Sequence, residues 1–106
     1  MKEEEKKVLS GQATDEQIAM WKNLHGKVFQ FEVDGSVCYL KRPSRNVISA
    51  AETIGKEDNL KYAEIVLNNC WLGGDETIKT DDEKFISVAN HMGTLVKISE
   101  VAVKEL

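Results

Sequence analysis

The sequence predicts an α+β fold, in which a β-hairpin packs against a small bundle of about four helices. An Asp-Gly pair between two apolar runs, at residues 28–40, is typical of a hairpin, and the first run alternates with polar residues. Four other stretches carry apolar residues at three- and four-residue intervals, which is the spacing of amphipathic helices. With 106 residues, 42% of them hydrophobic, the chain has the size and composition of one folded domain.

This single domain is predicted to span residues 13–106, because no repeat, linker or low-complexity stretch divides them. Residues 1–12 are expected to form a mobile arm, since a mixed run of Lys and Glu there precedes a Ser-Gly pair. The charged start is followed by no long apolar run, so neither a signal peptide nor a membrane span is predicted. We therefore expect a cytoplasmic protein without a membrane partner.

A short first helix is expected after Thr14. Thr14 and Gln17 have the capping-box pattern, in which the Thr hydroxyl accepts from the Gln backbone N–H and the Gln side chain reaches back. Trp21 is the expected anchor of the apolar stripe. Gly26 is the expected end, because glycine readily takes a left-handed conformation.

The hairpin has one apolar face. Phe29, Phe31 and Val33 alternate with polar residues before the turn at residues 34–35, and the return strand is expected at residues 37–40. Two strands alone are only marginally stable in water. The apolar face is therefore expected to pack on helices.

Two further helices follow the hairpin. Ser44 is the expected N-cap of the first, and Gly55 ends it. The second, expected within residues 59–75, is apolar around much of its circumference, so we expect neighbours to bury it on several sides. Gly73 and Gly74 are expected to end it.

The last helix is expected after a polar loop at residues 75–79. Thr80 and Glu83 form a second capping-box pattern, and an apolar stripe runs from Phe85 to Val96. Residues 97–106 fit either a strand or a helix, and the helix is favoured.

No catalytic, metal-binding or cofactor-binding site is predicted. Cys38 and Cys70 each lie in an apolar run, which is typical of small buried side chains. Neither His25 nor His91 is spaced with another residue as metal ligands are. The acids of residues 75–83 lack the regular alternation of a calcium loop. An enzyme that uses Cys70 with His91 is the formal alternative.

The net charge of −4 is opposite in sign to that of a typical sequence-independent nucleic-acid binder. One basic cluster, Lys41, Arg42 and Arg45, lies where the return strand meets the next helix. Such cations either protect a sheet edge from unwanted pairing or contact acidic groups on a partner. Both interpretations stay open.

Three stretches together resemble a known family. They read VFQFEVDGSVCYLKRPSR in the hairpin region, LNNCWLGGDETIKTDDE after the central helix begins, and FISVANHMGTLVKI in the last helix. This arrangement resembles the small tail assembly chaperones of tailed bacteriophages and prophages. In that family a hairpin presents a strand, a basic residue, Pro, Ser or Thr, and Arg ahead of a helical bundle, a pattern similar to residues 39–45 here. The likeness covers roughly residues 27–97 and leaves the arm and the first helix unmatched.

The resemblance implies a non-enzymatic protein that binds the long tape measure protein before the tail tube forms around it, and that often oligomerises. The partner surface would include apolar residues near strand and helix ends, beside the basic cluster. The candidate partner-binding residues are Tyr39, Lys41, Arg42, Arg45, Leu72 and Ile78. The alternative is a small interaction or regulatory module of a mobile element that binds nucleic acid through the basic cluster, although the net charge argues against such a partner.

Overall fold

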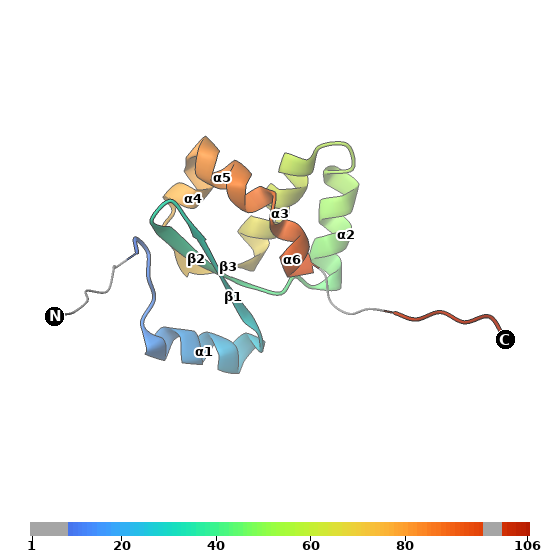
Figure 1. Ribbon diagram of the computed structural model, residues 1–106, viewed down its shortest axis with the longest axis horizontal. Helices are drawn as coiled ribbons and strands as arrows, with labels where there is room; N and C mark the ends of the chain where they lie inside the picture. Colours follow the sequence, from blue (N-terminus) through green and yellow to red (C-terminus); the bar gives the residue numbers. More distant parts are fainter. Residues whose placement is uncertain (1–8, 97–100) are drawn as a thin grey trace.

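The structure, a computed structural model, describes residues 9–96 and 101–106. These residues form an α+β fold with six helices and a three-stranded antiparallel sheet of order β1-β2-β3, which confirms the predicted fold class (Figure 1). The elements are α1 (Asp15–His25), β1 (Val28–Val33), β2 (Ser36–Lys41), α2 (Arg45–Ile54), α3 (Asn59–Cys70), β3 (Trp71–Gly74), α4 (Thr77–Thr80), α5 (Asp82–Ala89) and α6 (Met92–Val96).

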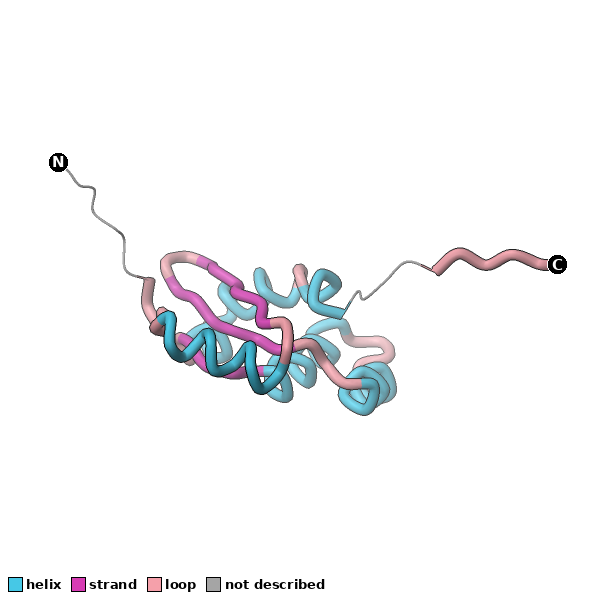
Figure 2. Tube along the Cα trace, turned by 90° about the horizontal axis from the view of Figure 1, so that it is seen from below, coloured by secondary structure: helices cyan, strands magenta, loops and turns pink. Residues whose placement is uncertain are grey.

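The sheet separates α1 from the other helices (Figures 1 and 2). On the α1 side, the Trp21 ring lies 5.4 Å from the Tyr39 ring, centroid to centroid, so Trp21 anchors α1 as predicted. The Tyr39 hydroxyl also accepts a hydrogen bond from the backbone N–H of Ala13. On the opposite side, Cys38 and Leu40 of β2 join the core that α3, α5 and α6 complete.

The hairpin forms in the register that its turn dictates. Val33 pairs with Ser36, and Val28 pairs with Lys41 at the other end. Asp34 and Gly35 both have positive φ, 49° and 78°, as a type I′ hairpin turn requires. β2 is central in the sheet, and its residues from Ser36 to Leu40 are buried.

The core lies between the sheet and the helices. The central helix α3 contributes more to it than any other helix, as its wide apolar arc predicted. The buried members of this cluster are Cys38, Leu40, Ala51, Ala63, Val66, Leu67, Cys70, Ile78, Val88, Met92 and Leu95.

β3 corrects the prediction that the central helix continues as far as Gly73 and Gly74. α3 ends at Cys70, and Trp71 already has an extended backbone. The chain then pairs with β2, placing Gly73 opposite Tyr39 and Gly74 opposite Cys38. Pairing with a buried strand outweighs the local helical pattern, because the unpaired side of β2 would otherwise lack hydrogen bonds.

The helix caps confirm two local predictions and correct a third. Thr14 and Gln17 form the complete capping box of α1, and Ser44 caps α2. At α5, however, the N-cap is Asp81, whose carboxylate accepts from the Lys84 backbone N–H at 3.0 Å. Thr80 instead ends the short helix α4, which occupies part of the predicted loop.

The last predicted helix is divided into α5 and α6, which are separated by residues 90–91. The helix favoured for residues 97–106 is wrong for 101–106, which form no helix; residues 97–100 lie outside the described residues. Part of the predicted arm is attached to the sheet: Ser10 N–H donates to Gly35, and Ser10 C=O accepts from Val37 N–H, both at 2.9 Å. Residues 1–8 of that arm also lie outside the description.

Candidate functional site

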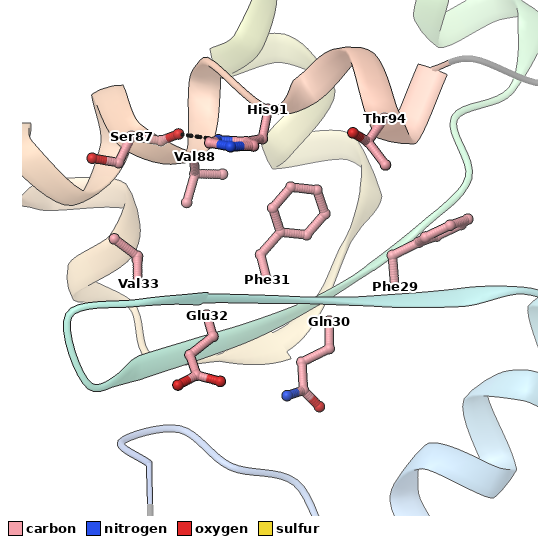
Figure 3. A pocket seen from close by; sticks show the side chains of 9 residues that line it. All are labelled: Phe29, Gln30, Phe31, Glu32, Val33, Ser87, Val88, His91 and Thr94. Carbon is pink, nitrogen blue, oxygen red and sulfur yellow. Dashed lines mark hydrogen bonds between the residues drawn. The ribbon is translucent and has the colours of Figure 1, made fainter.

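An apolar groove lies between β1 and the helices α5 and α6 (Figure 3). Its volume is about 360 Å³, and it is open to solvent rather than enclosed. The residues that line this β1 groove are Phe29, Gln30, Phe31, Glu32, Val33, Ser87, Val88, His91 and Thr94.

The alternation of β1 gives the groove its apolar character. Phe29, Phe31 and Val33 point from the strand toward the helices, and Gln30 and Glu32 point to the other side of the sheet (Figure 3). The three apolar side chains are only half-buried, because the helix layer does not cover them fully. The sequence predicted this apolar face but gave no sign that part of it stays open.

The backbone edge of β1 is available for pairing. β1 is an edge strand of the sheet. On β2, both backbone groups of Val37 bond away from β1, the N–H to Ser10 and the C=O to the Asp75 N–H. Its partner Glu32 therefore turns its own N–H and C=O outward, and so does Gln30 two residues earlier. No hydrogen bond from the described part of the chain reaches these outward groups.

A polar cluster at the turn end of the hairpin stabilises the fold. The Ser36 hydroxyl donates to Asp75 Oδ2 at 2.7 Å and accepts from Lys84 Nζ at 2.9 Å. The pKa of Asp75 lies well below its usual range, because its carboxylate accepts hydrogen bonds from the Ser10 side chain and from Thr77 and Ser36. A Ser–Lys pair can act as a nucleophile and base, but Ser36 is only 2% exposed, so a substrate has no access to its hydroxyl.

The two cysteines have the environment of core residues. Both are free and buried. Burial raises the pKa of the Cys38 thiol to about 12 and also raises the pKa of Cys70. A nucleophilic cysteine has the opposite properties, a lowered pKa and an accessible sulfur. His91 is exposed on the groove wall, where its Nδ1 lies 3.0 Å from the Ser87 carbonyl oxygen and donates to it.

Within the described residues, no group of three or more His, Cys, Asp or Glu side chains is arranged to hold a metal ion. In the same part of the chain, no helix is both long and apolar enough to cross a bilayer.

The predicted partner-binding residues do not form one surface. Tyr39 and Ile78 are buried, at 2% and 0% exposure, so both must be removed from the candidates. Tyr39 packs under α1, and Ile78 is part of the core. Both were expected near element ends. In the structure Tyr39 pairs with Gly73 of β3, and Ile78 is the buried residue of α4, two elements that the sequence did not predict. Leu72 lies in β3 and is half-buried.

The basic cluster lies beside one end of the groove. Lys41 and Arg42 are half-buried and Arg45 is exposed. The Arg42 guanidinium carbon lies 5.2 Å from the centre of the Phe29 ring, which lines the groove. Among the predicted residues, Arg42 therefore contacts a side chain that lines the groove.

Comparison of the chain with protein-family models, with curated protein sequences and with solved structures found no match.

Proposed function

We propose that the chain is a non-enzymatic protein-binding module that acts as a tail assembly chaperone of a phage or prophage. In this proposal it works in the cytoplasm of the bacterial host and binds the tape measure protein during tail morphogenesis. The resemblance over residues 27–97 suggests this class of partner. The observation that carries protein binding is the β1 groove, where an apolar face and a free strand edge lie together.

The groove suits an extended apolar segment of a partner. The outward N–H and C=O groups of Gln30 and Glu32 offer main-chain hydrogen bonds to an added strand. Alternate side chains of that strand would cover Phe29 and Phe31, and each large apolar side chain that becomes fully buried contributes about 1.5–3 kcal/mol. Main-chain bonds depend little on sequence, which suits a protein that must protect many segments of one long chain.

Nucleic-acid binding is the second candidate function, with the basic cluster as its support. Its phosphate contacts would weaken steeply with added salt. We expect no salt-sensitive binding of duplex DNA, measured by fluorescence anisotropy; binding that is lost at moderate salt would replace the present proposal.

The proposal is tested by affinity capture of the tagged chain from its native host, with any prophage induced, followed by mass spectrometry. Thr94→Arg places a long charged side chain on the groove wall from an exposed position. The matched control is Thr53→Arg, an exposed threonine on α2 outside the groove.

The wild-type chain and Thr53→Arg are expected to recover a long, helix-rich, tape-measure-like protein, and Thr94→Arg is expected to lose it. Recovery of no such protein by the wild-type chain would contradict the chaperone proposal. Equal recovery by both variants would contradict the assignment of binding to the groove.

A further inference from the structure

Residues 101–106 present unpartnered apolar side chains. Val101 and Val103 are 80% and 89% exposed, and Leu106 is fully exposed. This segment reads VAVKEL, so its first apolar pair recurs at every second residue, the period of a strand. Figures 1 and 2 show it lying clear of the domain, and no hydrogen bond joins it to the other described residues.

We infer that segment 101–106 of one copy of this chain adds as a strand to the edge of β1 in a second copy. Segment 101–106 supplies exposed valines and backbone groups without hydrogen bonds to the other described residues. The edge of β1 supplies outward N–H and C=O groups and the apolar side chains of the groove. Each surface offers what the other lacks.

The first four residues of the segment, 101–104, match the side-chain alternation of β1. When Val101 and Val103 face the helices, they cover Phe31 and its apolar neighbours in the groove. Lys104 then faces the opposite side of the sheet, the side to which Glu32 points. Opposite charges on neighbouring strands stabilise pairing, and this charge match holds for either direction of the added strand.

The location of the two surfaces favours a second copy as the occupant. The segment follows α6, whose residue Thr94 lines the groove. Figures 1 and 2 both show the segment extending away from β1 and α5. Strand and groove are different surfaces, so two copies can exchange strands reciprocally, or many copies can join head to tail.

The inference deepens the proposed function, because it assigns a second occupant to the same groove. Self-association covers the open apolar face until a partner displaces the added strand. The pairing itself requires no tape measure protein and can be tested with the purified chain.

The experiment measures the molar mass of the full chain by sedimentation equilibrium over a concentration series reaching about 1 mM, the range of a weak interface. The wild-type chain and Thr53→Arg are expected to associate as concentration rises. Val103→Asp, which removes the strand's apolar contact from an exposed position, and Thr94→Arg, which blocks the groove, are each expected to stay monomeric.

A mixture of the two variants provides the decisive control. Val103→Asp keeps an intact groove and Thr94→Arg keeps an intact strand, so the mixture is expected to regain one productive contact per pair. A wild-type chain that stays monomeric, a Val103→Asp chain that associates like wild type, or a mixture that does not associate would each overturn the inference. If self-association behaves as expected but capture recovers no tape-measure-like protein, only the chaperone proposal fails.

Discussion

At the scale of single residues, the hydroxyl of Ser36 connects three parts of the fold. It donates to Asp75, which follows β3, and accepts from Lys84 of α5. Lys84 Nζ also donates to the Thr77 hydroxyl at 3.0 Å. Ser36 is buried and its hydroxyl both donates and accepts a hydrogen bond, as a buried polar group requires. The cluster holds the turn end of the hairpin against the helices.

Asp75→Asn is expected to lower stability at neutral pH by an amount that shrinks in acid. The pKa of Asp75 is lowered in the folded chain, first by the Ser10 side chain and then by Thr77 and Ser36. A lowered folded pKa adds stability above the unfolded value of about 3.9, and this is lost as pH falls toward the folded pKa. Urea unfolding of both chains at several pH values measures the difference, and a difference independent of pH would contradict the assignment.

Neither cysteine is expected to react with a thiol reagent in the folded chain at pH 8. Burial raises the pKa of Cys38 to about 12 and raises that of Cys70, so little thiolate forms and the reagent has no access. In urea, both thiols should be labelled. Labelling is followed by absorbance, and rapid native labelling of Cys70 would revive the enzyme hypothesis.

At the scale of elements, β3 shows how closely backbones approach in this fold. A Cβ at Gly73 would lie 3.0 Å from the Trp21 ring, and a Cβ at Gly74 would lie 2.5 Å from the Cα of Cys38. Gly74 also has a φ of +138°, which other residues rarely adopt. The pair was predicted to end a helix, but in the structure it allows β3 to lie against β2 and α1.

Two glycine-to-alanine variants are expected to have opposite effects. Gly74→Ala should cost at least about 2 kcal/mol of unfolding free energy, because the methyl group meets backbone atoms at a strained φ. Gly93→Ala in α6 should add about 0.5–1 kcal/mol, since its Cβ has open space and alanine favours helix. Urea titrations of both variants measure these changes, and a neutral Gly74→Ala would contradict the close packing of β3.

The elements that the sequence predicts are those with local causes. The capping box of α1, the N-cap of α2 and the Asp34-Gly35 hairpin depend on neighbours a few residues away. β3 depends on pairing with a strand more than 30 residues earlier, and its own residues have a helical pattern. The sequence predicts the basic cluster as part of a partner-binding surface. It does not predict the groove, because the groove depends on which helix covers which strand.

At the scale of the whole molecule, the helix layer leaves the edge of β1 uncovered. Helices α5 and α6 lie on the apolar face, and the groove between them and β1 stays open (Figure 3). Exposed edge strands invite pairing with other chains, and proteins usually block them. Here the edge lies beside half-buried aromatic side chains, so both hydrogen bonding and apolar burial favour an added strand.

The most direct test of the central claim is amide hydrogen exchange, measured by NMR at Gln30 and Glu32. In the monomeric Val103→Asp chain these outward amides should exchange fast. The backbone N–H of Phe31 points toward β2, so its amide should exchange slowly. When the captured partner binds, or when wild-type chains associate, the amides of Gln30 and Glu32 should become protected. Binding that leaves both amides fast would contradict the assignment of the β1 groove as the binding site.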